Sequence, residues 1–400
     1  MDFIASRMQR IKPSPSSMAT ARVKALRAEG RNIVGLTSGE PDFDTPPHIV
    51  EAAYAAMKAG QTRYTVVDGT PELKRAIVAK FKRENGLEYA PDQVSVGNGG
   101  KQVIYNALTA TVQRGDEVVI PSPYWVSYPD MVLLNGGTPV PVPCLPEHGY
   151  KLQPADLDAA ITQRTKWLVI NSPCNPSGAA YTRAELQAIG AVLLRHPQVW
   201  VLTDDVYEHL YYDDFRFTTM AQAVPELAAR TLTVNGVSKA FAMTGWRIGY
   251  AAGPKALIQA MAKLQSQSTS NPSAVSQAAA LAALNGPMDF LDGWRSEYAK
   301  RRDLVVGRLN AIEGLSCPTP QGAFYVFPSC AGLIGRRTPT GGEIVDDTAL
   351  VLHFLDAQGV GTVQGAAFGL SPAFRISFAT SAAELAEGCD RIARACAELT

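Results

Sequence analysis

Short apolar runs alternate with helical stretches through most of the chain. The runs are rich in Val, Ile and Leu, and they lie at residues 93–96, 117–120, 138–142, 167–171, 199–203, 231–234 and 248–252. Helical periodicity separates several of them, at residues 101–112, 156–161 and 183–195. Short apolar strands alternating with helices predict an α/β fold, with a mostly parallel sheet covered by helices on both faces. Catalytic loops in such folds follow the carboxyl ends of the strands.

The two ends of the chain show a different pattern. Helices and two short strands fill the C-terminal part, at residues 274–285, 289–309, 322–326, 348–357, 374–377 and 382–399. A helix at 19–29 and a strand at 33–37 precede the large sheet, so we expect them to join this smaller α+β unit. The predicted division places 1–45 in the small domain, 46–290 in the large domain and 291–400 in the small domain again.

Composition narrows the class of protein. The 400 residues are 46% hydrophobic and 18% charged, as in a globular protein, and 37 basic residues balance 37 acidic ones. A net charge of zero argues against nucleic acid or an anionic membrane as partner. No apolar run reaches the ~18 residues of a membrane helix, and the first ten residues lack a signal-peptide core. We therefore expect a soluble, cytoplasmic protein. The histidines and cysteines show no metal-ligand spacing, so no metal is expected.

The stretch from Asn235 to Tyr250 carries the strongest chemical signal. Ser238 and Lys239 follow the predicted strand 231–234, and Arg247 opens the next strand after a glycine-containing loop. A lysine amine there can form a Schiff base with an aldehyde-bearing phosphate, while the arginine and the hydroxyl hold the phosphate oxygens. An ordinary surface lysine with a structural arginine is the alternative, and for an isolated Ser-Lys pair it is the commoner meaning.

The whole stretch resembles the cofactor-lysine signature of class I, fold type I aminotransferases, which depend on pyridoxal phosphate (PLP). Further motifs follow the order of the bacterial aspartate aminotransferase subgroup that includes aspartate/glutamate–prephenate aminotransferases: MQRIKPS at 8–14, GEPDFDTP at 39–46, GGKQ at 99–102, SPYWVSYP at 122–129 and NSPCNPSG at 171–178. The resemblance covers essentially the whole chain. It implies a seven-stranded type of sheet, PLP as cofactor, amino acids and 2-oxo acids as ligands, and a homodimer with shared active sites. The implied reactions are transamination of L-aspartate with 2-oxoglutarate and of prephenate to arogenate.

Asp204 is the expected partner of the cofactor ring. It follows the apolar strand 199–203, so its carboxylate can reach a site at the carboxyl edge of the sheet. A carboxylate there can pair with a protonated pyridine nitrogen and keep the ring an electron sink. Asp205 competes for this role, but alternation along the strand sends it to the opposite face, and the family pattern uses the first acid of such a pair. A helix N-cap is the alternative role for Asp204.

Three further side chains can contact the cofactor ring. Tyr207 can donate to its phenolic oxygen, and Asn175 can bond the same oxygen as well as the substrate carboxylate. Trp125 can stack on the ring and border the substrate. A plain turn around Asn175 and a core position for Trp125 are the alternatives.

The phosphate is expected at the turn before residue 101. Small residues and a helix N-terminus meet there, and the resemblance assigns Gly100 and Lys101 to the phosphate cup. Tight strand–helix turns have the same composition, which is the commoner meaning of such a motif alone. Tyr64 resembles the tyrosine that reaches the phosphate of the neighbouring subunit.

Substrate contacts are expected from both ends of the chain. Arg375 stands in the apolar strand 374–377, where a buried guanidinium needs an anionic partner. The resemblance makes that partner the α-carboxylate of the amino acid, while an internal salt bridge is the alternative. By resemblance, the Gly39 backbone also contacts this carboxylate, and Lys12 reaches the distal carboxylate of dicarboxylic substrates.

Other functions remain compatible with the same lysine and fold, because these do not fix the reaction type. A PLP lyase or synthase would keep Lys239 and Asp204 and differ in its substrate contacts. A ligand-sensing transcription regulator would need a basic DNA-binding domain, and none is expected before Lys12. An aminotransferase acting on aromatic or other amino acids is a further alternative, so the preferred amino acceptor stays open.

Overall fold

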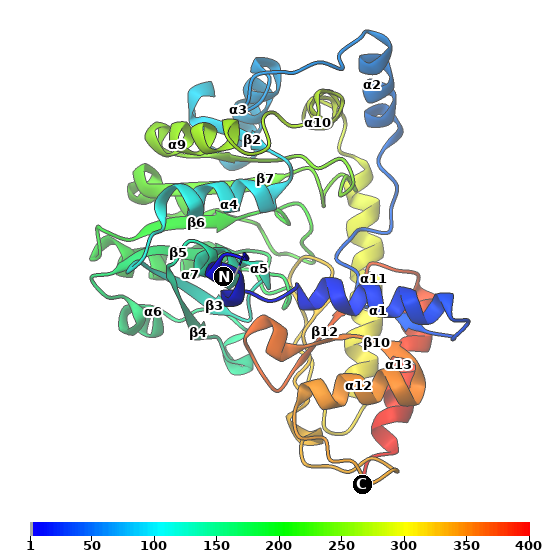
Figure 1. The fold of residues 1–400 in the computed structure, drawn as a ribbon. Coiled ribbons are helices and arrows are strands. Elements are labelled where there is room, and N and C mark those ends of the chain that lie inside the picture. The colour runs from blue at the N-terminus through cyan, green and yellow to red at the C-terminus, as the bar shows by residue number, and fades with distance from the viewer. Residues whose placement is uncertain (1–2) are drawn as a thin grey trace.

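The computed structural model describes residues 3–400, and its large sheet has seven strands in the order β2-β8-β7-β6-β5-β3-β4 (Figure 1). The strands are β2 (Val94–Gly97), β3 (Glu117–Ser122), β4 (Thr138–Pro143), β5 (Thr165–Asn171), β6 (Trp200–Asp204), β7 (Thr231–Gly236) and β8 (Gly249–Ala252). Strand β8 runs antiparallel to β2 and β7, and the other neighbours pair in parallel. The predicted α/β fold with a mostly parallel sheet is confirmed.

Helices cover both faces of this sheet. They are α3 (Pro71–Asn85), α4 (Gly100–Thr111), α5 (Ser127–Leu134), α6 (Pro154–Ala160), α7 (Arg183–Leu194), α8 (Met220–Ala223), α9 (Lys255–Ser266) and α10 (Ala274–Asn285), while α2 (Pro47–Lys58) packs on α10. Successive strand residues enter different cores. Val118 packs in one apolar cluster and Val119 in another, as the twofold alternation of a strand requires. Apolar side chains therefore fill both faces of the sheet, and a ligand can bind only at the ends of the strands.

The two ends of the chain build a second, smaller unit. It contains α1 (Pro15–Ala28), β1 (Val34–Gly35), α11 (Phe290–Asn310), β9 (Tyr325–Val326), α12 (Asp347–Gln358), β10 (Val360–Gly361), β11 (Val363–Gln364), β12 (Phe374–Ser377) and α13 (Ala382–Ala397). Val34 pairs with Val360, so the first strand joins the C-terminal part. In Figure 1 the long helix α11 runs from beside the large sheet into this unit. The domain boundaries at 45 and 290 stay a prediction, which this pairing supports.

Helix ends follow local sequence signals. Helix α3 begins at Pro71, where the Thr70 hydroxyl accepts from the Leu73 N–H, and it ends before Gly86 in the left-handed conformation. Proline at the first position of a helix and glycine just after its last residue are common local signals for helix ends. Helix α1 begins at Pro15, four residues before the predicted start, because proline is well tolerated in a first helical turn. No helix within residues 3–400 is long and apolar enough to cross a membrane.

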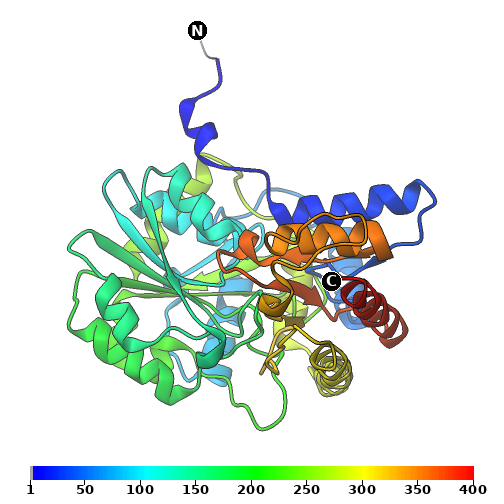
Figure 2. The same ribbon diagram turned by 90° about the horizontal axis from the view of Figure 1, so that it is seen from below.

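Short 3₁₀ helices complete the chain. They are η1 (Ser6–Arg10), η2 (Pro91–Gln93), η3 (Pro146–His148), η4 (Pro225–Arg230), η5 (Ala331–Leu333) and η6 (Gly365–Phe368). The first of them contains no buried residue. Figure 2 shows this N-terminal segment extending away from the body of the subunit.

Candidate active site

A cavity of about 710 Å³ lies where the ends of the large sheet meet the small unit and α1. Eleven of the thirteen residues predicted from sequence line it: Gly39, Gly100, Lys101, Trp125, Asn175, Asp204, Tyr207, Ser238, Lys239, Arg247 and Arg375. Lys12 and Tyr64 are the two that do not. Eight of them lie at or just beyond the ends of β2, β3, β5, β6 and β7 of the large sheet, which is the arrangement expected for a site at the carboxyl edge of a sheet.

Lys239 lies three residues beyond the end of β7 and reaches into the cavity. Its Nζ donates to the carbonyl oxygen of Gly39 at 2.5 Å and lies 5.7 Å from the centre of the Tyr207 ring. Burial lowers the pKa of Lys239 to about 8, against the opposing effect of the Glu40 carboxylate. An amine with such a pKa is partly neutral near pH 7.5, so it can act as a nucleophile and carry protons.

The two neighbouring aspartates point to different surroundings. Asp204 ends β6 and lines the cavity, where its Oδ2 accepts a 2.6 Å hydrogen bond from the Tyr128 hydroxyl. Burial raises the pKa of Asp204, although the Tyr128 bond opposes this. Asp205 is outside the cavity lining, and its Oδ1 accepts from the Thr203 hydroxyl at 2.6 Å. No α-helix starts at Asp204, so the N-cap alternative has no helix to cap.

Positive groups gather at the N-terminus of α4. Gly99 has φ of 85°, and a Cβ on it would lie 2.4 Å from Nη2 of Arg247. A Cβ on Gly249 would lie 2.1 Å from the Gly100 nitrogen, so two glycines permit this close packing. Burial lowers the pKa of Lys101, and so does the positive charge of Arg247. Two cations beside the free N–H groups of a helix N-terminus form an anion site.

Trp125 forms a flat wall of the cavity. Its ring stands edge-on to Tyr128, with the ring centres 5.2 Å apart, and the Lys101 ammonium lies 4.8 Å from its centre. The side chain is half-buried: it lines the cavity and also packs against the apolar clusters that contain Val103 and Val126. The cavity position and the core position considered for this tryptophan are therefore both occupied by the same side chain.

Arg375 is a buried cation without an acidic partner. It is 2% exposed, and its guanidinium donates to Asn175 Oδ1 at 2.9 Å and to the carbonyl oxygen of Thr37 at 2.6 Å. Its Nε has no hydrogen-bond partner, and within residues 3–400 its partners are the Asn175 amide oxygen and the Thr37 carbonyl oxygen, with no carboxylate in an ion pair with it. Burial lowers the pKa of Arg375. The internal salt bridge considered as an alternative is absent, which leaves an anionic ligand as the natural partner.

The two remaining predicted residues lie outside the cavity. Lys12 is exposed and lies near Asp130 of α5: burial raises the pKa of that carboxyl, and the Lys12 charge partly opposes the rise. Tyr64 lies in the loop between α2 and α3 and is 91% exposed. An exposed position is compatible with a contact to a neighbouring subunit, and the role of each residue stays a prediction.

Several contributors to the site were not predicted. Tyr128 bonds Asp204, and the Tyr325 hydroxyl is 2.9 Å from that of Tyr207. The Asn171 side chain bonds the Asn175 N–H and the Asp204 carbonyl, both at 2.8 Å. The sequence pattern could have indicated Asn171, because it is the polar residue at the end of an apolar strand. The two tyrosines had none, because their partners are far away in sequence.

Comparison with known proteins identifies the family of this α/β chain. The profile described as aminotransferase class I and II matches residues 31–392. The chain is 59% identical over 400 residues to the aspartate/prephenate aminotransferase of Cereibacter sphaeroides, and the alignment covers all of both chains. The chain therefore belongs to the class I and II aminotransferases, and it is an aminotransferase.

Solved structures agree with this assignment. The crystal structure of the aspartate aminotransferase from Rhizobium meliloti superposes with a TM-score of 0.97 at 55% identity, over 99% of each chain. The aspartate aminotransferase from Thermus thermophilus with maleate gives a TM-score of 0.92 at 42% identity, over 99% of this chain and 100% of the other. The fold implied by the sequence resemblance is thereby confirmed.

Proposed function

We propose that the protein transfers the amino group of L-aspartate to 2-oxoglutarate, giving oxaloacetate and L-glutamate, with pyridoxal phosphate as cofactor. The observation that carries this proposal is the meeting of Lys239, Asp204 and the unpaired Arg375 in one cavity. The names of similar proteins from Cereibacter sphaeroides and Rhizobium meliloti support aspartate as a substrate. The first name also supports transamination of prephenate to arogenate as a second activity.

The cavity residues fit pyridoxal phosphate. The cations Lys101 and Arg247, with Ser238, suit the phosphate, while the Asp204 carboxylate suits a protonated ring nitrogen. Trp125 offers a flat face to the ring. When bound, the cofactor supplies an aldehyde that accepts the amino group and a ring that withdraws electrons from the substrate Cα.

The chain's own groups would move and hold the proton. The Lys239 Nζ can take the proton from the substrate Cα and return it elsewhere, because its pKa of about 8 lets it exchange protons near neutral pH. Asp204 would hold a proton on the ring nitrogen by a charge-assisted hydrogen bond. Asn175 has Oδ1 turned to Arg375, so its Nδ2 is the atom left to donate to the ring oxygen, together with the Tyr207 hydroxyl.

Substrate recognition would use Arg375 and the N-terminal region. The guanidinium binds the α-carboxylate that all amino and 2-oxo acids share, beside the Gly39 backbone. Lys12 binds the distal carboxylate of aspartate, glutamate and prephenate, for which the N-terminal segment has to approach the cavity. The maleate of the Thermus thermophilus structure is itself a dicarboxylate.

We also propose a homodimer with shared active sites. Large apolar side chains are exposed on α2 and in the loop after it: Val50, Tyr54, Met57, Tyr64 and Val66. Exposed apolar patches of this kind mark protein interfaces. In the dimer, Tyr64 would reach the partner subunit's phosphate site.

An amino-acceptor panel tests the function. The holoenzyme is assayed with aspartate and glutamate as donors and with 2-oxoglutarate, oxaloacetate and prephenate as acceptors, while lyase products are measured in parallel. We expect transfer without lyase activity. Borohydride reduction followed by peptide mapping should locate the pyridoxyl group on Lys239. A label on another lysine, or lyase products in place of transfer, would contradict the proposal.

A further inference from the structure

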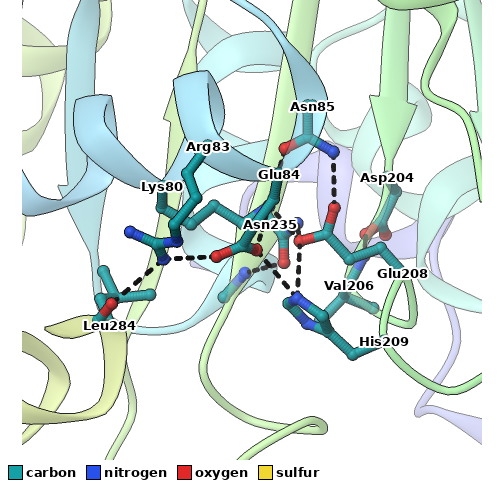
Figure 3. Close-up of polar contacts among 11 residues, drawn as sticks. Lys80, Arg83, Glu84, Asn85, Asp204, Val206, Glu208, His209, Asn235 and Leu284 are labelled. Carbon is teal, nitrogen blue, oxygen red and sulfur yellow. Dashed lines mark hydrogen bonds and ion pairs between the residues drawn. The ribbon is translucent and has the colours of Figure 1, made fainter. Parts of the chain in front are cut away.

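A buried polar network lies beside the end of β6, at Asp204, and the turn that follows it (Figure 3). Its members come from three elements: Lys80, Glu84 and Asn85 from α3, Glu208 and His209 from the turn after β6, and Asn235 from β7. Lys80, Asn85, Glu208 and Asn235 are each almost completely buried. None of these residues lines the cavity, so the proposed chemistry gives them no direct role.

Glu208 is the centre of the network. Its Oε1 accepts from Asn235 Nδ2 at 2.7 Å and forms an ion pair with the Lys80 ammonium, while its Oε2 accepts from Asn85 Nδ2 at 2.9 Å. Lys80 also donates to Asn85 Oδ1 at 2.8 Å. Burial would raise the pKa of Glu208, but the charge of Lys80, together with His209 and the hydrogen bonds from Lys80 and Asn85, outweighs it and lowers the pKa. Both carboxylate oxygens are thus fixed by donors from two other elements.

The same cluster brings together Glu84, Glu208 and His209, whose ligand atoms lie within 4.8 Å of one another. Such a set could in principle hold a metal ion. However, the Lys80 ammonium already contacts Glu208 and lies 3.5 Å from the Glu84 carboxylate. The same oxygen, Glu84 Oε2, also lies 2.9 Å from His209 Nε2. The lysine therefore provides the positive charge that balances these acids.

The position of the network along the chain points to its use. Glu208 follows Tyr207 directly and Asp204 by four residues, and Asn235 precedes Lys239 by four residues. The bond from Asn235 to Glu208 therefore connects the turn after β6 with the end of β7, just before the turn that carries Lys239. Asn235 Oδ1 also accepts from the Gly236 N–H at 2.7 Å, which fixes the end of β7. Replacing a buried ion pair by apolar side chains is often neutral for stability, so stability alone does not account for charges at this place.

We propose that the Lys80–Glu208 pair is a positioning element, which holds the turns carrying Asp204, Tyr207 and Lys239 in register with each other. This inference rests on the proposed function, and it assigns a supporting role to residues that lie outside the cavity. Small displacements of catalytic groups have large effects on rate. The rate and cofactor affinity should therefore depend on the network even where stability does not.

Four variants test this role. Glu208→Gln keeps the shape and removes the charge, Lys80→Met removes the ammonium that pairs with Glu208, and the double variant Lys80→Met/Glu208→Leu removes both charges. Lys74→Met is the matched control, because Lys74 lies on the same helix, forms an ion pair of 2.6 Å with Asp68 and does not line the cavity. The measurements are the melting temperature, cofactor dissociation constant, kcat and KM. A fifth is the pKa of Lys239 in the cofactor-free protein, obtained from the pH dependence of its acylation.

We expect the double variant to recover much of the thermal stability that Lys80→Met loses. Its kcat should nevertheless stay about 10- to 100-fold low with KM little changed, and its cofactor affinity should also stay reduced. The pKa of Lys239 should rise from about 8 toward that of an ordinary lysine, because a loosened turn admits water. Lys74→Met should change none of the site measurements.

Two results would overturn the proposal. One is a double variant with the kcat, cofactor affinity and Lys239 pKa of the wild type, which would make the network a structural support only. The other is loss of wild-type activity after dialysis against a chelator, restored by a divalent ion, which would make the cluster a metal site. If Lys80→Met does not fold, Asn235→Ser removes a single donor and is measured in the same way. Failure of the proposed function would appear separately, as wild-type holoenzyme without transaminase activity, because the Lys239 pKa is read without cofactor.

Discussion

The two sides of the cavity are built differently. On the sheet side, Asp204 and Lys239 come from the ends of neighbouring parallel strands, and other groups of the chain already bond them. On the opposite side, Arg375 comes from β12 and has an unsatisfied Nε, while Lys12 is exposed on the N-terminal segment. The sheet side is thus complete without substrate, whereas the other side lacks an anion.

The two sides of the cavity therefore contribute to catalysis in different ways. On the sheet side, burial and fixed hydrogen bonds set the protonation of Lys239 and Asp204 before substrate arrives, which is preorganisation. On the substrate side, the desolvated guanidinium of Arg375 gains an anionic partner only when a substrate binds. The binding free energy on this side therefore comes mainly from the carboxylate of the substrate. Variants on the sheet side should therefore affect every substrate through kcat, and those at the N-terminal segment should affect some substrates selectively.

Lys239→Ala should have the largest effect. The variant keeps the phosphate and ring contacts, so it should still bind pyridoxal phosphate. It loses the amine that moves the proton, and kcat should fall by about 10⁴-fold or more. Single-turnover kinetics with aspartate will measure this. A kcat within tenfold of the wild type would mean that another base serves the reaction.

Asp204→Asn should follow, with kcat lower by about 10³-fold and weaker cofactor binding for every substrate. The amide keeps the size of the side chain but loses the charge that would pair with the ring nitrogen, and truncated buried charge pairs cost about 3–5 kcal/mol. Steady-state kinetics and cofactor titration measure both effects. The isosteric control is Asp205→Asn, which should change kcat little because Asp205 does not line the cavity. Reversed effects would exchange the roles of the two acids.

The buried Asp205 carboxyl also allows a prediction about how the stability of the protein depends on pH. Burial raises its pKa to about 7 in the folded protein, above the usual value for an aspartate in an unfolded chain. The folded state therefore holds the proton more tightly, and this contribution to stability is present at low pH and lost as pH rises toward 7. Asp205→Asn should consequently raise the melting temperature more at pH 8 than at pH 5. An equal shift at both pH values would mean that Asp205 is ionised throughout.

Sequence alone predicted the sheet side better than the substrate side. Lys239 and Asp204 each follow an apolar strand, so their placement needed only strand ends and alternation. Contacts between distant positions were not predictable, because periodicity carries no information about them. Tyr128 meets Asp204 across 76 residues and Asn85 meets Glu208 across 123 residues. The place of Lys12 depends on how a terminal segment lies against the body, which no local pattern specifies.

Arg375→Leu should lower kcat/KM for every substrate by about 3 kcal/mol, roughly 150-fold. The α-carboxylate is common to all donors and acceptors, so aspartate, prephenate and alanine should lose alike. Arg375→Lys keeps the charge but not the two-pronged geometry, and it should recover only part of the loss. Kinetics with the three substrates check this. A loss confined to dicarboxylic substrates would place Arg375 at the distal carboxylate.

Lys12→Ala should have the smallest and most selective effect. If the N-terminal segment brings Lys12 to the distal carboxylate, kcat/KM for aspartate and prephenate should fall by about 2 kcal/mol, roughly 30-fold. Alanine has no distal carboxylate, so its already low kcat/KM should change little. Lys24→Ala is the informative comparison, because Lys24 lies on α1 and lines the cavity in this structure, whereas Lys12 does not.

A selective loss in Lys24→Ala alone would assign the distal carboxylate to α1. Equal losses on all three substrates in Lys12→Ala would mean that Lys12 supports the fold. A selective loss in Lys12→Ala alone would show that the open side of the cavity is completed by movement of the N-terminal segment, because the present position of Lys12 gives it no contact with the site.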